Sequence, residues 1–219
     1  MKKFYTLFLF LIAALFVQAG QAIPQRDACA AYSKGGFANN DDYLVWIDRI
    51  LGSLKTPDVF LVETDAIANI VADRCLSNEQ VLMRELLLAE TIKRLKASPN
   101  AVAVYLDAGH AEWFSDPSVL VEPLKRSGVQ MADGITVNTS FFDATKKTAD
   151  WSGKLIDELG GDKGVVIDTS RNGNGAAPSS VKGEARWCNP VGRALGDAPS
   201  TKTIAAHIHA YLWIKNVGE

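Results

Sequence analysis

An apolar run that ends in a polar cluster, VAVYLDAGH at residues 102–110, shows the pattern on which the fold prediction rests. Residues 102–106 are apolar and include the β-branched side chains typical of a buried strand, and Asp107 and His110 follow them. Further short apolar runs occur at residues 59–62, 134–137, 165–167 and 210–214. The last of these fits a helix almost as well as a strand.

Helical patterns separate these runs. Residues 41–54, 78–97, 117–126 and 144–159 carry apolar side chains at helical spacing, and Ser77 with Gln80 has the spacing of a capping box. Strands that alternate with helices predict βα units and a parallel sheet. No glycine-rich phosphate loop follows any of the apolar runs, which argues against a nucleotide-binding Rossmann fold and favours a barrel.

The composition is that of one globular domain. The chain has 219 residues, 47% of them hydrophobic and 22% charged, with a formal net charge of -2 and no basic run of the kind that binds nucleic acid. Lys2 and Lys3 before the apolar residues 4–17 predict a signal peptide, with cleavage after Ala22. A membrane anchor or a buried strand is the alternative. We therefore expect a secreted single domain over residues 23–219 that does not bind a membrane.

Polar residues follow all five apolar runs. The clusters begin at Glu63, Asp107, Asn138, Asp168 and Lys215. In an α/β barrel the carboxyl ends of the strands meet on one face, and that face holds the catalytic residues. The repeated position of these clusters predicts a single polar pocket.

Longer strings in the same order resemble glycoside hydrolase family 6. These are RD at 26–27, LVETD at 61–65, YLDAGH at 105–110, DTSRNG at 168–173, WCN at 187–189, LWIK at 212–215 and GE at 218–219. The resemblance implies an α/β fold, a distorted parallel β/α barrel of the TIM-like, seven-stranded type. It also implies inverting hydrolysis of β-1,4-glucan, above all cellulose, without a metal or an organic cofactor. The residues of these motifs are similar to those of bacterial endoglucanases, so the resemblance implies endo action. We also expect a monomer.

The resemblance assigns the catalytic roles. An inverting glycosidase needs a carboxylic acid to protonate the leaving oxygen and a base to activate water on the opposite side of the sugar. Asp65 matches the general acid, and Asp27 matches a neighbour that raises its pKa and helps to activate water. Arg26 would pair with the ionised partner. From the residues alone, Asp65 could instead cap the helix that begins at Ala66.

Other residues match supporting roles. The resemblance implies that Asp107 organises the charged network and that Ser33, in a loop with two following glycines, holds the water relay. His110 would contact sugar hydroxyls, or it is a structural histidine. His207 and His209 are too few to predict a metal site.

Substrate contacts are expected from both aromatic and polar residues. Trp113 and Trp187 are candidate platforms on which the flat face of a glucose ring would stack, although each could equally be a core residue. Trp46 and Trp151 lie in predicted helices and are expected in the core. The resemblance implies that Lys215 and Glu219 bind sugar hydroxyls near the cleavage point. Asn138, after the third apolar run, is a further expected substrate-binding residue.

The chain also departs from the family pattern. Cys29 and Cys75 match the family's first disulfide, whereas Cys188 matches half of a second whose partner follows later in the family. The family continues Gly-Glu-x-Asp-Gly beyond the position of Glu219, and it has a longer stretch before Arg26. We therefore expect a barrel that is incomplete at both ends and less stable than a full one. The alternative function is glucan binding without turnover, and a hydrolase for another polysaccharide is a third possibility.

Overall fold

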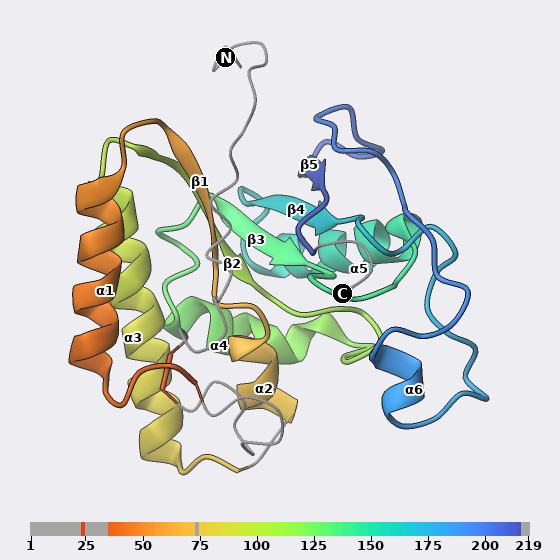
Figure 1. Ribbon diagram of the computed structural model, residues 1–219, viewed down its shortest axis with the longest axis horizontal. Coiled ribbons are helices and arrows are strands. Elements are labelled where there is room, and N and C mark those ends of the chain that lie inside the picture. Colours follow the sequence, from red (N-terminus) through yellow and green to blue (C-terminus); the bar gives the residue numbers. More distant parts are fainter. Residues whose placement is uncertain (1–22, 25–34, 73–74, 216–219) are drawn as a thin grey trace.

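The computed structural model describes residues 23–24, 35–72 and 75–215. Helices and strands alternate along this part of the chain (Figure 1). The strands are β1 (Asp58–Val62), β2 (Ala101–Asp107), β3 (Gly134–Val137), β4 (Gly164–Asp168) and β5 (Ile208–Leu212). The helices are α1 (Asn40–Ser53), α2 (Ala66–Ala72), α3 (Asn78–Ala97), the 3-10 helix η1 (Pro117–Leu120), α4 (Val121–Arg126), α5 (Thr145–Glu158) and α6 (Glu184–Trp187).

The five strands form one parallel sheet in the order β1-β2-β3-β4-β5. Because this order follows the chain without a reversal, each crossover winds in the same direction and brings its helix to the same face. A doubly wound nucleotide-binding sheet would reverse its strand order instead. The described strands therefore form a half-barrel of the α/β type, which confirms the parallel α/β prediction. The count of seven strands stays a prediction.

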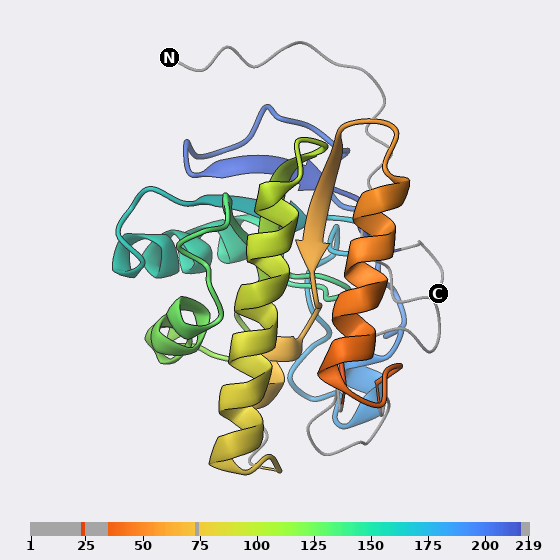
Figure 2. The same ribbon diagram turned by 90° about the vertical axis from the view of Figure 1, so that its left-hand side faces the viewer.

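The two faces of the sheet carry different clusters. Phe60 and Leu106 point into the main apolar core, which also contains side chains of α1, α3, α4 and α5. Leu61, Tyr105 and Val166 belong to a smaller cluster. Successive side chains of a strand point to opposite faces, so this smaller cluster lies on the side away from the helices. Figure 2 shows α1 and α3 side by side over β1, on the outer face.

The element predictions agree with the structure to within two residues at each boundary. The fifth apolar run is a strand, β5, that begins and ends two residues earlier than predicted, so the helical alternative was wrong. The capping box is confirmed, because the Ser77 hydroxyl accepts from Gln80 N at 3.2 Å and the Gln80 side chain accepts from Ser77 N at 2.8 Å. Helix α6 was not predicted, since four residues are too few for a periodic apolar pattern, whereas α2 begins at Ala66, where the alternative interpretation of Asp65 as a cap had placed the start of a helix.

Several predicted features lie outside the described residues. They are the signal peptide at 1–22, Arg26, Asp27, Cys29, Ser33 and Glu219. The pairing of Cys29 with Cys75 therefore stays a prediction, while Cys188 is free and exposed. Across the ranges that the structure covers, no helix has both the length and the apolar character needed to cross a membrane.

Candidate active site

Two buried aspartates end strands of the sheet on its inner face. Asp107 follows Tyr105 by two residues on β2, and Asp168 follows Val166 by two residues on β4. The two-residue period places both aspartates on the same side as the smaller apolar cluster. Asp107 is 1% exposed and Asp168 is fully buried. The predicted gathering of polar residues at the carboxyl ends of the strands is therefore present, with these two carboxyl groups at its base.

Asp65 and Asp107 come together from neighbouring strand ends. The Oδ1 atom of Asp107 accepts from the backbone N of Asp65 at 3.0 Å and from Gly109 N at 2.9 Å. Its Oδ2 atom accepts from the Thr139 hydroxyl at 2.8 Å. Burial and the nearby charge of Asp65 raise the pKa of Asp107 to about 7. This pair can hold a proton near neutral pH, which a proton-donating site requires.

The backbone around Asp65 has an unusual conformation. Asp65 has a φ of 66° and Glu63 a φ of 48°, in the left-handed region that non-glycine residues rarely adopt. Asn39 and Ser77, whose side chains cap α1 and α3, have extended backbones instead. Asp65 directly precedes α2, and its carbonyl accepts from Asn69 N at 2.8 Å, so the helix-cap alternative stays open beside the catalytic one. A left-handed backbone of this kind is also found at functional sites. The side chain of Glu63 contacts α1, where Tyr43 Oη donates to Glu63 Oε1 at 2.8 Å.

Asp168 has a different set of partners. Its Oδ1 accepts from the backbone N atoms of Ser170 at 2.9 Å and Ile214 at 3.2 Å, and its Oδ2 accepts from Ser140 N at 2.9 Å. Burial raises the pKa of Asp168, while these hydrogen bonds oppose the shift. One carboxyl group thus joins the segments that follow β3, β4 and β5.

Asn138 makes a similar link. Its amide donates to Asp168 O at 2.9 Å and to Asp143 O at 3.2 Å, and its Oδ1 accepts from Asp143 N at 3.0 Å. The side chain is fully buried. The structure gives Asn138 a joining role, and the expected sugar contact stays a prediction.

Arg171 follows Asp168 on the same loop. Its guanidinium lies 4.5 Å from the centre of the Phe142 ring and donates to Ser140 O and to Asn189 Oδ1, the latter at 3.0 Å. Burial lowers the pKa of Arg171, and the charge of Asp168 opposes that shift. The cation therefore connects the ends of β3 and β4 with the segment that follows Trp187.

His110 is held by aromatic rings. Its ring stacks on Phe141 with centres 3.5 Å apart and on Trp113 with centres 5.2 Å apart. Its Nδ1 lies 3.9 Å from Asp143 Oδ2. Burial lowers the pKa of His110 to about 3, so its imidazole is neutral at ordinary pH. A neutral ring can both donate to and accept from a sugar hydroxyl, in line with the expected role.

The tryptophans differ in exposure. Trp151 is buried and donates to Phe114 O at 2.6 Å, and Trp46 packs against the main core, so both core predictions are confirmed. Trp187, on α6, is 39% exposed, and Trp113 is partly buried beside His110. Lys215 is partly buried beyond β5. Trp187 and Trp113 therefore keep accessible surface, as a sugar platform requires.

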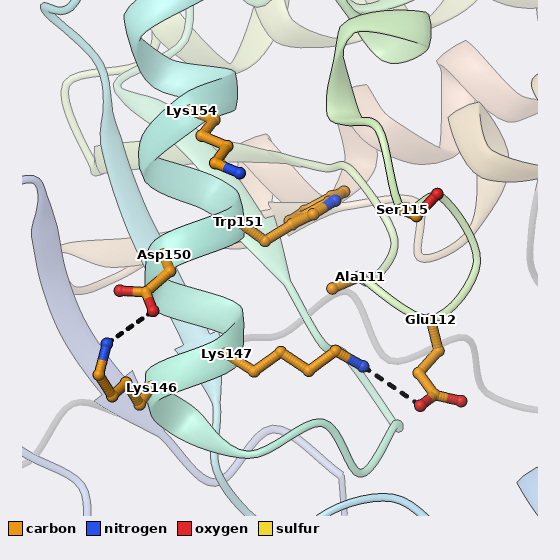
Figure 3. A pocket seen from close by; sticks show the side chains of 8 residues that line it. All are labelled: Ala111, Glu112, Ser115, Lys146, Lys147, Asp150, Trp151 and Lys154. Atoms are coloured by element: carbon orange, nitrogen blue, oxygen red, sulfur yellow. Dashed lines mark hydrogen bonds and ion pairs between the residues drawn. The ribbon is translucent and has the colours of Figure 1, made fainter. Parts of the chain in front are cut away.

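A hollow of about 760 Å³ lies beside this site. It is lined by Ala111, Glu112, Ser115, Lys146, Lys147, Asp150, Trp151 and Lys154 (Figure 3). It contains none of the carboxylates at the strand ends, so it is distinct from the Asp65–Asp107 pair. Within the described part of the chain, no group of three or more His, Cys, Asp or Glu side chains could hold a metal ion.

Some residues near the site were not singled out from the sequence. Asp143 accepts from Lys147 Nζ at 2.5 Å and from Glu112 N at 3.0 Å, close to His110. Its place shortly after the third apolar run was a usable signal. No sequence signal indicated that Phe141 stacks on His110, because stacking between two loops depends on tertiary structure.

Comparison with known proteins identifies relatives over most of the chain. The sequence matches the family model for glycosyl hydrolases family 6 over residues 13–219. Endoglucanase A of Cellulomonas fimi is 35% identical over 198 residues, which cover 90% of this chain and 40% of that protein. A probable 1,4-beta-D-glucan cellobiohydrolase C of Aspergillus fumigatus is 31% identical over 245 residues, which cover 95% of this chain and 52% of that protein. The chain thus spans about half the length of the curated relatives it matches.

A solved structure agrees with these matches. The chain is similar to an endoglucanase of Mycobacterium tuberculosis in complex with methyl-cellobiosyl-4-deoxy-4-thio-β-D-cellobioside, with a TM-score of 0.78 and 43% identity. The match covers 89% of this chain and 64% of that chain. The half-barrel and the order of its loops therefore follow a known architecture.

Proposed function

Because the chain belongs to glycosyl hydrolases family 6, we propose that it cleaves the β-1,4-glucosidic bonds of cellulose and soluble β-1,4-glucans with inversion. The observation that carries this proposal is the contact between Asp65 N and Asp107 Oδ1 at 3.0 Å, which joins two acidic residues at neighbouring strand ends. The relatives include proteins named as endoglucanases and as a probable cellobiohydrolase. We propose endo action and secretion, in line with the resemblance to bacterial endoglucanases and the signal-like N-terminus.

Asp65 is the proposed general acid. It would protonate the glycosidic oxygen as the bond to the anomeric carbon breaks, so it must carry a proton when the substrate binds. Two carboxyl groups that lie close together oppose each other's ionisation, so Asp65 and Asp107 share a proton near neutral pH, with the charge of Asp65 raising the pKa of Asp107. The neighbour proposed to keep the proton on Asp65 is Asp27. The hydrogen bonds from Asp65 N and Gly109 N fix Asp107 at this position.

The water that attacks the sugar needs a base on the opposite side. Asp27 is proposed to take part in its activation, with Ser33 holding a relay water and Arg26 pairing with the ionised carboxylate. These three residues lie outside the described residues, so their support is the resemblance alone. Trp187, Trp113 and the neutral His110 are proposed to bind the glucan chain.

Reducing-sugar release from carboxymethyl cellulose by the full chain tests the proposal. Replacing the acid, Asp65→Asn, keeps the shape of the side chain but removes the proton donor, so the rate is expected to fall by about 10²–10⁴-fold. Asp116→Asn is the matched control. Asp116 is an exposed cap of η1 that accepts from Ser118 N, and asparagine caps a helix equally well.

Three outcomes separate the possibilities. Release that Asp65→Asn abolishes and Asp116→Asn preserves supports the hydrolase. Undiminished release by Asp65→Asn, or a product whose anomeric configuration is retained when it is followed by NMR, would overturn the assigned mechanism. A folded chain that binds cellopentaose without releasing sugar would favour the glucan-binding alternative.

A further inference from the structure

The short helix α6, which carries Trp187, lies on a long connection between β4 and β5 and stands away from the sheet (Figure 1). The base of this connection is closed by a bridge between Asn172 and Ala194 and by the hydrogen bond from Gly173 N to Ala194 O at 3.0 Å. Several residues separate this base from α6 on each side. The position of Trp187 relative to the strand ends therefore depends on contacts made near α6 itself.

Arg186, the residue before Trp187, makes such contacts. Its Nη1 donates to Ala177 O at 2.6 Å and to Pro178 O at 2.7 Å, within its own connection. Its Nη2 donates to Glu112 Oε2, on the loop that follows β2. Both side chains of this ion pair are 23% exposed, so the pair remains accessible to water and salt. Arg186 thus ties α6 to a loop that lies 74 positions earlier in the sequence.

Glu112 is itself firmly placed. Its Oε1 accepts from Lys147 Nζ at 3.2 Å, a pair that Figure 3 shows across the side of the hollow. Its backbone N donates to Asp143 Oδ2, and Lys147 bonds the other oxygen of the buried Asp143. Burial alone would raise the pKa of Glu112, but the hydrogen bonds from Arg186 and Lys147 hold it below its usual value. The carboxylate is therefore ionised at neutral pH.

Glu112 also lies next to Trp113 and two residues after His110. We propose that Glu112 is a positioning residue: through Arg186 it fixes the Trp187 segment against the loop that carries His110 and Trp113, and so sets the affinity for the glucan chain. This inference rests on the proposed function. It concerns binding rather than bond cleavage, since the ion pair lies outside the Asp65–Asp107 pair.

The first test does not require activity. Cys188 is free, exposed and adjacent to Trp187, so a nitroxide spin label on its thiol reports the mobility of the segment. Glu112→Gln keeps the shape of the side chain but removes its charge, and the label is expected to become more mobile. The matched control is Asp150→Asn, which removes the exposed ion pair between Asp150 and Lys146 (2.6 Å) on the neighbouring helix and should leave the spectrum unchanged (Figure 3). Cys188→Ser verifies that the label is on the intended thiol.

The second test uses cellopentaose, a neutral substrate, so that salt acts on the protein alone. Glu112→Gln is expected to raise KM about fivefold and to change kcat by less than about twofold. The lost contact would hold the glucan chain equally well in the ground state and in the transition state, and the proposed acid is unchanged. Raising the salt concentration should increase KM for the wild type and not for Glu112→Gln. Arg186→Met should behave like Glu112→Gln, and the double variant should be no worse than either, as expected for two partners in one interaction.

The outcomes distinguish this inference from the proposed function. Unchanged label mobility in Glu112→Gln, or additive effects in the double variant, would overturn the positioning role even if the enzyme is fully active. An equal loss of kcat and kcat/KM would also contradict it, because it would place Glu112 in the chemical step. If the wild type binds cellopentaose without hydrolysing it, the hydrolase proposal fails, and the same comparison is made with dissociation constants.

Discussion

The strands β2 and β4 both end in an aspartate that is almost completely buried, yet the groups around the two aspartates differ. Asp107 and Asp168 are both almost completely buried, and burial raises the pKa of each. Asp107 has a second acidic residue beside it, Asp65, whose charge raises its pKa further. For Asp168, the Ser170 side chain and three backbone N–H groups, spread over both oxygens, oppose the shift.

The difference shows how one side chain serves two purposes. A carboxylate that accepts from backbone N–H groups joins chain segments, because those donors are fixed and cannot change roles. Asp107 accepts on one oxygen from the Thr139 hydroxyl, which can turn and become an acceptor. The end of β2 can therefore lose a proton or gain one without losing its hydrogen bonds, whereas both oxygens of Asp168 at the end of β4 accept from backbone N–H groups.

The largest expected effect comes from Asp107→Asn. The amide oxygen can keep the bonds from Asp65 N and Gly109 N, and its NH₂ group can donate to Thr139, so the fold should persist. The titrating carboxyl group beside the proposed acid is lost, and kcat for soluble cellulose should fall by about 10²–10⁴-fold. Steady-state kinetics together with a melting curve measure both quantities. A variant with normal kcat would remove Asp107 from the proposed chemistry.

The same substitution at the end of β4, Asp168→Asn, should act on stability instead. An NH₂ group must replace one of two oxygens that face backbone N–H donors, so a buried donor loses its acceptor. Such a loss costs about 2–3 kcal/mol. Thermal unfolding should show a Tm lower by about 5–10 °C for a chain of this size. If Asp107→Asn lowered Tm as much as Asp168→Asn, the contrast between flexible and fixed partners would be wrong.

The pH dependence of stability provides a third comparison. The pKa of Asp107 is about 7 in the folded protein and roughly 3.9 in an unfolded chain, so the folded state binds the proton more tightly. Its contribution to stability is complete below about pH 4 and is lost as the pH rises through about 7. Between pH 5 and pH 7 the wild type should therefore lose roughly 2 kcal/mol relative to Asp107→Asn, which cannot titrate. Parallel curves of Tm against pH for the two proteins would contradict the raised pKa.

Much of this architecture could be predicted from the sequence, because it depends on local patterns. The run that ends in Asp107 predicted a buried strand with a polar end, and the period of two places Asp107 on the inner face. The order of the runs also predicted a parallel sheet, which the strand pairing confirms.

The partners of these residues could not be predicted in the same way. Thr139, Ser140 and Ile214 approach the two aspartates from other loops, and these contacts exist only once the strands are in register. The left-handed backbone of Asp65 gave no sequence signal either, because glycine is the residue expected at such a φ. Strand ends are therefore predictable, whereas the chemistry at each end depends on the neighbouring loops.

The smallest expected effect tests the role of the Thr139 hydroxyl at the end of β2. Its hydrogen bond favours the charged form of Asp107 and so lowers the pKa of that carboxyl. Removing it with Thr139→Val should raise the pKa of Asp107 by about 0.5–1 unit, which a ¹³C NMR titration of the Asp107 carboxyl measures. Thr136→Val is the matched control, since the Thr136 hydroxyl faces Thr139 at 3.4 Å and should move the titration less. An equal shift in both variants would mean that packing, rather than the hydrogen bond from Thr139, sets the proton affinity at this strand end.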